Sequence, residues 1–136
     1  MRVLLVINDM TVSGRMGVMS LSAVLKKNGH QVYLLTIRQN SLKKIYKFMA
    51  NFLPDIVGYS AMTGEHLELI SLNSILKKDF RFISVFGGPH ATFYPQLIYE
   101  MGIDSVCIGE GNLALPEFCR RIEYKENYWS TENCQI

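Results

Sequence analysis

The sequence lacks the cysteine patterns that define disulfide-rich, zinc-binding and iron–sulfur domains. Its 136 residues include three cysteines, and none of them forms a CxxC or CxxxCxxC spacing. The odd number and the spacing exclude a disulfide framework and a cysteine site for a metal ion or an iron–sulfur cluster in this chain. Cys107 lies within an apolar run and is expected in the core.

Long apolar runs and a strong charge of one sign are also absent. The first apolar run, Val3–Ile7, ends at Asn8-Asp9 and is too short for a signal peptide or a membrane span, so we expect a cytoplasmic protein. The formal net charge is +2 and 49% of the residues are hydrophobic, a composition that indicates neither disorder nor a polyanion-binding surface. The lysine pairs at 26–27, 43–44 and 77–78 are expected on solvated helix faces.

Several catalytic and nucleotide-binding motifs are missing. There is no GxGxxG, no GxxxxGK[ST] and no GxSxG, so the usual dinucleotide site, P-loop and nucleophile elbow are excluded and no catalytic residue is assigned. A phosphorylation receiver domain needs carboxylates after its first and third strands and a lysine after its fifth. The corresponding positions hold Asp9, Ser60 and Gly109, which argues against that class.

Five short apolar runs are present, each bounded by turn residues. They are continuous rather than alternating, which is typical of parallel strands buried on both faces. The runs are Val3–Ile7, Val32–Leu35, Ile56–Tyr59, Phe82–Phe86 and Ser105–Ile108.

Segments with helical spacing separate these runs. Met16, Met19, Leu21, Val24 and Leu25 predict a helix that ends at 26–29, and further helices are expected over residues 41–52, 65–78, 94–101 and 113–122. The alternation predicts an α/β fold, a doubly wound, Rossmann-like (flavodoxin-like) sheet of five parallel strands with helices on both faces. Ligands of such sheets bind outside the carboxyl ends of the strands.

The loops at that edge contain the candidate binding residues. Residues 8–17 are expected to form a long loop, 87–92 begin with paired glycines, and 109–111 read Gly-Glu-Gly. The glycines either make turns or admit a ligand close to the backbone. Glu110 either caps the next helix or contacts the ligand, and the hydroxyls of residues 60–64 either line a slot or form local turns.

Of the three histidines, only His90 falls in such a loop. His30 and His66 are expected to be structural or solvated.

Taken together, residues 53–64, 85–95 and 103–111 resemble the N-terminal cobalamin-binding domain of cobalamin-dependent radical SAM enzymes. The resemblance extends from Arg2 to about Ile122, and its most specific part is GGPHAT at 87–92 combined with GEG at 109–111. It implies that the cofactor's nucleotide tail enters a slot beside the sheet while the corrin lies over the strand ends. The implied cofactor-binding residues are Met10, Thr11, Gly14, Arg15, Ser60, Met62, Thr63, Gly87, Gly88, Pro89, His90, Gly109, Glu110 and Gly111.

One departure from related cobalamin domains concerns the first loop. Methionine-synthase and mutase types carry DxHxxG, whose histidine binds cobalt. Here Thr11 occupies the histidine position, and a register based on Gly17 places Gly14 there. We therefore expect base-off cobalamin without a histidine ligand from this loop, with Met10, Thr11 and Arg15 facing the lower side of the corrin.

The resemblance also implies that the chain is part of a larger enzyme of the methyltransferase type. An iron–sulfur cluster and S-adenosylmethionine would belong to a downstream radical SAM domain, with residues 1–122 as the cobalamin-binding domain and 123–136 as the start of a linker. No nucleic-acid or membrane partner is expected. The alternatives are a nucleotide or nucleotide-sugar binding domain of a transferase and, less favoured, a structural interaction domain.

Overall fold

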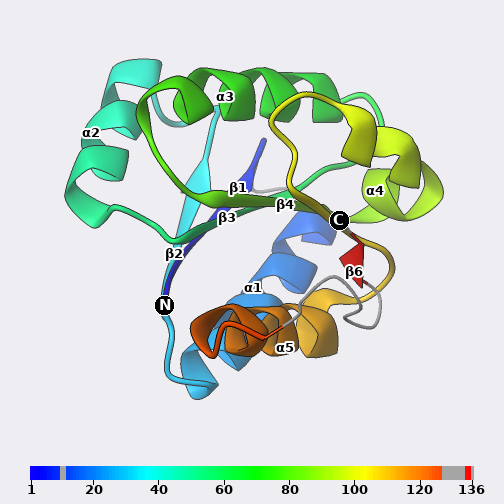
Figure 1. The fold of residues 1–136 in the computed structure, drawn as a ribbon. Coiled ribbons are helices and arrows are strands. Elements are labelled where there is room, and N and C mark those ends of the chain that lie inside the picture. Colours follow the sequence, from blue (N-terminus) through cyan, green and yellow to red (C-terminus); the bar gives the residue numbers. More distant parts are fainter. Residues whose placement is uncertain (10–11, 127–133, 136) are drawn as a thin grey trace.

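A computed structural model describes residues 1–9, 12–126 and 134–135, with the backbone alone for residues 12–15 and 134–135. A central sheet lies between two layers of helices (Figure 1). The strands are β1 (Arg2–Ile7), β2 (Gln31–Thr36), β3 (Ile56–Ser60), β4 (Ile83–Gly87), β5 (Ser105–Cys107) and β6 (Cys134–Gln135). The helices are α1 (Val12–Lys27), α2 (Leu42–Phe52), α3 (His66–Asp79), α4 (Pro89–Phe93), the 3₁₀ helix η1 (Pro95–Tyr99) and α5 (Gly111–Glu123).

The strand order is β2-β1-β3-β4-β5-β6. Strands β1 to β5 are all parallel, which confirms the predicted five-stranded doubly wound sheet. The short β6 adds an antiparallel pair at the edge, with Cys134 opposite Cys107. Strand order reverses between β1 and β3, and ligands of this fold class bind beside such a reversal.

Both faces of the sheet are covered by helices, as Figure 1 shows. Helices α2, α3 and α4 cover one face, where Leu4 and Val6 of β1 are buried, whereas α1 and α5 cover the other face, where Val3, Leu5 and Ile7 are buried. Successive side chains of a strand point to opposite faces. A strand buried on both sides therefore needs a continuous apolar run.

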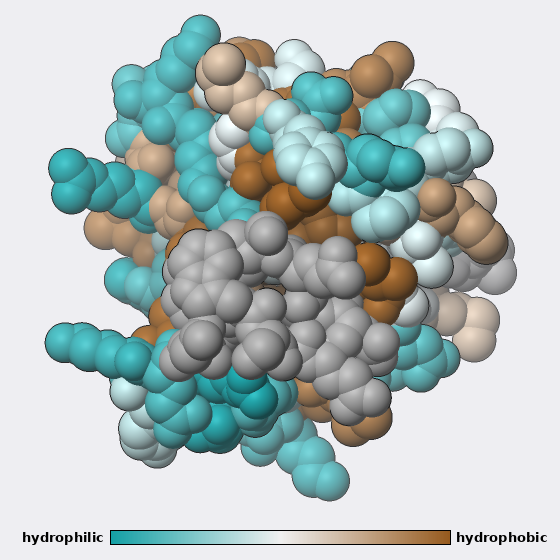
Figure 2. Space-filling view, turned by 45° about the vertical axis from the view of Figure 1, so that its right-hand side comes forward, coloured by the Kyte–Doolittle hydropathy of each residue, from teal (hydrophilic) through white to brown (hydrophobic). Residues whose placement is uncertain are grey.

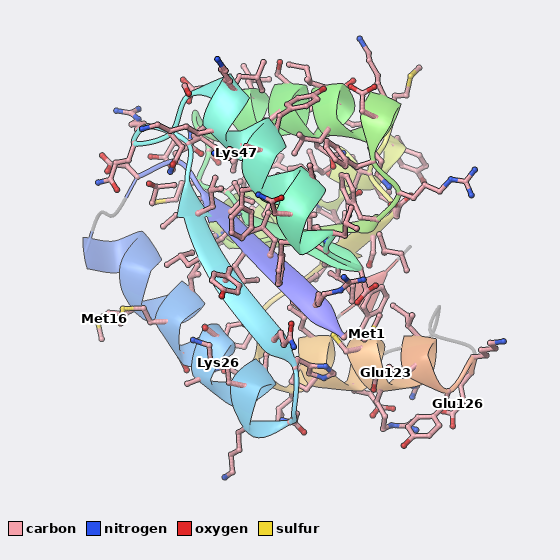
Figure 3. The ribbon with its side chains drawn as sticks, turned by 90° about the vertical axis from the view of Figure 1, so that its left-hand side faces the viewer. Met1, Met16, Lys26, Lys47, Glu123 and Glu126 are labelled. Carbon is pink, nitrogen blue, oxygen red and sulfur yellow. The ribbon has the colours of Figure 1, made fainter. Side chains whose placement is uncertain are left out.

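The prediction of a long first loop over residues 8–17 is wrong, because α1 already begins at Val12. Gly14 and Arg15 consequently belong to the helix. The predicted apolar face of α1 is also corrected in part: Met16 and Met19 are 72% and 52% exposed, whereas Val18 and Leu25 are buried. Figure 3 shows Met16 projecting away from the body of the protein.

A helix over residues 94–101 was also expected, and the structure instead has α4 followed by η1. Pro95 explains the break, because a proline disfavours the α conformation in the preceding residue. Tyr94 accordingly has φ −129° and ψ 67°. Each of the two short helices has a proline in its first turn, where a missing N–H does no harm.

The lysine pairs follow the prediction with one exception. Lys26, Lys27, Lys43 and Lys44 are exposed, and Figure 3 shows Lys26 pointing outward. Lys77 differs because its ammonium group contacts the Asp104 carboxylate and the Phe82 carbonyl. It therefore holds α3 to the segments that lead into β4 and β5.

Candidate ligand-binding cleft

A cleft of about 260 Å³ opens between the sheet and helices α1 and α5, at the carboxyl ends of the strands. Every central parallel strand and both helices contribute to it. The lining residues are Leu5, Val6, Gly17, Val18, Leu21, Gly58, Tyr59, Ser60, Val85, Gly87, Gly88, Cys107, Gly109, Glu110, Gly111, Asn112 and Leu115.

Glycines on both walls create this space. Gly58 and Gly87 belong to the sheet, whereas Gly17 and Gly111 belong to α1 and α5. A Cβ at Gly17 would meet no described atom within 4 Å, and at Gly87 and Gly111 the nearest atoms would lie at 3.7 Å. A Cβ at Gly58 would lie 3.1 Å from the Leu5 side chain, so Gly58 is needed for packing within the wall. The volume that side chains would occupy at Gly17, Gly87 and Gly111 is therefore left free for a ligand.

Gly88 has a different role from the one expected. Its φ is +90°, and an added Cβ would lie 2.9 Å from the carbonyl oxygen and 3.0 Å from the nitrogen of Ala61. The turn after β4 thus requires glycine at this position even without a ligand. A bulky residue at Gly88 would disturb the backbone as well as the cleft, so it cannot test binding alone.

In the described part of the chain most of the cleft wall is apolar, and the polar side chains there are Ser60, Glu110 and Asn112. Glu110 is the N-cap residue of α5, yet its side chain makes no capping hydrogen bond, so the capping interpretation is wrong. Asn112 donates from Nδ2 to the Ser20 hydroxyl at 3.3 Å, joining α5 to α1.

Thr92 connects the two glycine turns that border the cleft. Its hydroxyl donates to the Gly88 carbonyl and accepts a hydrogen bond from the Gly109 N–H, both at 3.0 Å. Thr92 is the last residue of the GGPHAT segment and is not among the predicted site residues. The contact joins the GGPHAT segment to the GEG segment.

His90 lies beside the cleft in a stack of rings rather than in its lining. Its ring lies 3.7 Å from that of His66 at an interplanar angle of 14°, and 5.1 Å from that of Tyr94. Its Nδ1 is 3.0 Å from the Thr63 hydroxyl. Burial, followed by the proximity of His66, lowers the pKa of His90 from 6.5 and favours its neutral form at pH 7.

The structure thus separates the predicted site residues into three groups. The cleft brings together Ser60, Gly87, Gly88, Gly109, Glu110 and Gly111. The cleft lining does not include Met62, Thr63, Pro89 and His90, which lie on the loops beside it. Met10 and Thr11 lie outside the described residues, and Gly14 and Arg15 are described by their backbone alone.

Several lining residues were not predicted. Gly17 sits inside a helix and Gly58 inside a strand. An isolated glycine within such an element often marks a close approach, and this signal could have identified both residues.

The sequence matches a family described as the B12 binding domain over residues 4–119. The chain belongs to the B12-binding domain family. A Pyrococcus horikoshii protein described as an uncharacterized methyltransferase is 38% identical over 76 residues, which are 54% of this chain and 17% of that protein. The chain therefore spans less than a fifth of the length of this relative.

Membership of this family supports cobalamin as the ligand of the domain. In the described part of the chain, no three or more His, Cys, Asp or Glu side chains gather to hold a metal ion. No helix in the same described part combines the length and apolarity needed to cross a membrane.

Proposed function

We propose that this B12-binding domain holds the nucleotide tail of cobalamin in the cleft, with the corrin over the carboxyl ends of the strands. The observation that carries the proposal is the unfilled space at Gly17, Gly87 and Gly111. The cleft volume of about 260 Å³ is slightly below the usual range of small-molecule pockets, roughly 300–1,000 Å³. The cleft therefore suits one ring system of a large cofactor.

Ser60 and Glu110 are the polar side chains proposed to orient this tail. The Ser60 hydroxyl lies at the end of β3 in the cleft and can donate to the base nitrogen that base-off binding releases from cobalt. The Glu110 carboxylate can accept hydrogen bonds from amide or hydroxyl groups of the tail. Gly87, Gly109 and Gly111 allow the ligand to approach the backbone.

The corrin is proposed to rest on the loops that follow the strands. Met62 and Leu113 begin or precede helices at this edge and are 41% and 85% exposed. Such apolar side chains suit the apolar parts of a macrocycle. Met10, Thr11 and Arg15 remain the residues proposed to face its lower side.

We further propose that no histidine of the first loop binds cobalt. Residues 8–17 contain no histidine. In the neighbouring loops, the His66 Nδ1 accepts a hydrogen bond from the Gly64 N–H, and the His90 Nδ1 pairs with the Thr63 hydroxyl. Both rings are thus held by local contacts.

The domain is proposed to serve a radical SAM methyltransferase. Bound cobalamin would carry a methyl group between a donor and an acceptor, while the chain binds and orients the cofactor. The GGPHAT and GEG segments and the relative described as a methyltransferase support this proposal. The iron–sulfur cluster and S-adenosylmethionine would be held by another part of a longer protein, because this chain has no CxxxCxxC.

Cobalamin retention by two matched variants tests the location of the tail. Gly17→Phe adds a ring at a residue that lines the cleft and where an added Cβ meets no described atom within 4 Å, whereas Ala23→Phe adds the same ring to the exposed face of α1. After incubation with hydroxocobalamin and desalting, we expect a base-off visible spectrum for the parent and for Ala23→Phe. Gly17→Phe should bind at least about tenfold more weakly, because its ring fills the space of the base.

A colourless parent protein would refute cobalamin binding. Full retention by Gly17→Phe would show that the tail lies elsewhere. Electron paramagnetic resonance of the Co(II) form tests the axial ligand, and we expect no splitting from a coordinated nitrogen. Such splitting would contradict base-off binding without a histidine ligand, because it shows that either the cofactor's own base or a histidine coordinates cobalt.

A further inference from the structure

Among the residues whose side chains the structure describes, the interior of the cleft has almost no hydrogen-bonding groups. Its wall carries Leu5, Val18, Leu21, Val85, Cys107 and Leu115. Val6 and Tyr59 also border the cleft, but their side chains are buried in the core on the other face of the sheet. The surroundings of a bound ring are therefore mainly glycine backbone and hydrocarbon.

The polar side chains of the cleft are concentrated at its mouth. Glu110 and Asn112 lie at the beginning of α5, directly after the turn that follows β5. Asn112 is already bonded to Ser20. The strand backbones of the floor are paired with each other from Ile56–Ile83 to Ser60–Gly87. Ser60 is thus the side chain placed to bond with a ring that lies between the sheet and the helices.

A polar atom that is buried without a partner weakens binding, because it loses its hydrogen bonds to water. A dimethylbenzimidazole base that has left cobalt has one free ring nitrogen, which the Ser60 hydroxyl can satisfy. An adenine base in the same place has further ring nitrogens and an amino group. A single hydroxyl cannot satisfy all of them.

We infer that this cleft selects cobamides by the polarity of their lower base, accepting an apolar bicyclic base and discriminating against a purine. The inference rests on the proposed function and deepens it, because it concerns which member of the cofactor class the domain takes. The apolar wall residues determine the selection. The Ser60 hydroxyl donates a hydrogen bond to the one free ring nitrogen that both kinds of base have.

Equilibrium binding of three cobamides to the 136-residue chain tests the inference. The ligands are cobalamin, adeninylcobamide and cobinamide, which has the corrin but no base. We expect cobalamin to bind at least about tenfold more tightly than adeninylcobamide, because each unsatisfied buried group weakens binding. Cobinamide should also bind more weakly than cobalamin, because it leaves the cleft unfilled.

A pair of isosteric variants tests the physical cause. Val85→Thr adds a hydroxyl to the cleft-facing side of β4, and Val57→Thr makes the same change on the opposite face of β3. Val85 and Val57 are 3% and 0% exposed, so a similar loss of stability is expected from both. Val85→Thr should reduce the preference for cobalamin over adeninylcobamide several-fold, because the new hydroxyl can bond to the purine. Val57→Thr should leave the preference unchanged.

The outcomes separate the inference from the proposed function. Equal affinities for cobalamin and adeninylcobamide, with weaker cobinamide binding, would overturn the base selection and leave cobalamin binding intact. Equal affinities for cobalamin and cobinamide would show that the base is outside the cleft and overturn the selection. Failure of all three ligands to bind would overturn both proposals. A preference that changes equally in the two threonine variants would refute the apolar wall as its cause.

Discussion

The hydroxyl of Thr92 forms hydrogen bonds with two turns that lie in different parts of the sequence. One hydrogen bond reaches the carbonyl of Gly88 and the other comes from the N–H of Gly109. Gly88 and Gly109 both have positive φ, a backbone conformation that favours glycine. Thr92 is therefore a positioning residue for the mouth of the cleft.

Removal of this hydroxyl tests its role. Thr92→Val keeps the shape of the side chain and loses both hydrogen bonds, so we expect cobalamin affinity to fall up to about tenfold. Thr92→Ser retains the hydroxyl and should bind as the parent does. The affinity of each variant can be measured by titration with hydroxocobalamin. Equal losses in both variants would indicate that the methyl group, and not the hydrogen bonds, is responsible.

Tyr59 provides a prediction about stability. Its hydroxyl is buried and has no hydrogen-bond partner among the residues that the structure describes, while its ring stacks on Phe86 at 4.5 Å. Tyr59→Phe keeps the stack and removes the unsatisfied group, so the free energy of unfolding should rise by about 1 kcal/mol. Urea denaturation measures this change.

Tyr46→Phe is the matched control for Tyr59→Phe. The Tyr46 hydroxyl donates to the Asp79 carboxylate at 2.7 Å. Its removal should not stabilise the protein. A gain in stability of the same size in both variants would contradict the assignment of the Tyr59 hydroxyl as the unfavourable group.

At the scale of elements, the loops after β3 and β4 are joined by stacked rings and backbone bonds. His66 at the beginning of α3 and His90 in α4 lie face to face. The backbone N–H of His90 also donates a hydrogen bond to the backbone carbonyl of Ala61, at 3.0 Å. The backbone bond and the stacked rings thus both hold the segment directly after Gly88 against the loop that follows β3.

This arrangement predicts acid sensitivity. The pKa of His90 is lowered in the folded state by burial and by His66, so protonation below pH 6.5 favours the unfolded state. His30 has a pKa lowered mainly by burial and adds to the effect. The free energy of unfolding should therefore decrease as the pH falls from about 7 to 5.

Two variants measure how much of the pH dependence of the free energy of unfolding comes from His90. His90→Phe keeps a stacking ring without a titrating group and should flatten the pH dependence. Thr63→Val removes the partner of the His90 Nδ1 but keeps the histidine, so the pH dependence should persist. Urea denaturation at several pH values gives the comparison. If the free energy of unfolding of His90→Phe depends on pH as steeply as that of the parent, other groups cause the acid sensitivity.

The whole molecule has two differently built helix layers. The face covered by α2, α3 and α4 packs large rings such as Tyr59 and Phe86, whereas the opposite face has glycines at Gly58 and Gly87. Figure 2 brings the α4 side forward and shows apolar residues at the surface among hydrophilic ones. Phe93 and Tyr99 on this side are 77% and 87% exposed. Both layers bury apolar side chains, and the layer of α1 and α5 also contains the cleft.

The extent of the core predicts which part of the chain folds independently. Among the residues whose side chains are described, which end at Glu126, neither of the two core clusters includes one beyond Ile122. We expect a chain of residues 1–126 to keep the fold and a cooperative unfolding transition, because both helix layers remain complete. Circular dichroism and urea denaturation check this. Loss of the transition would show that the residues after 126 belong to the folded unit and would contradict a domain boundary at 122.

Some of the site was predictable because its signals are local. Paired glycines at Gly87 and Gly88 and the Gly109–Gly111 segment follow apolar runs directly, so their place at the strand ends could be predicted. The beginning of α1 could not, since the glycines at 14 and 17 suggested a loop although the helix includes both. The break at Tyr94 carried a local signal, Pro95, that the helical prediction did not use.

The sequence by itself determined the class of the fold and the edge at which a ligand binds, because apolar runs and turn residues act over short distances along the chain. Only the tertiary structure decided the shape of the cleft. Gly17 and Gly87 are far apart in the chain, and packing of α1 on the sheet is what brings their unfilled space together. The same packing placed Thr92 between two turns and His90 against His66. Such contacts depend on the relative positions of distant elements, which local patterns do not specify.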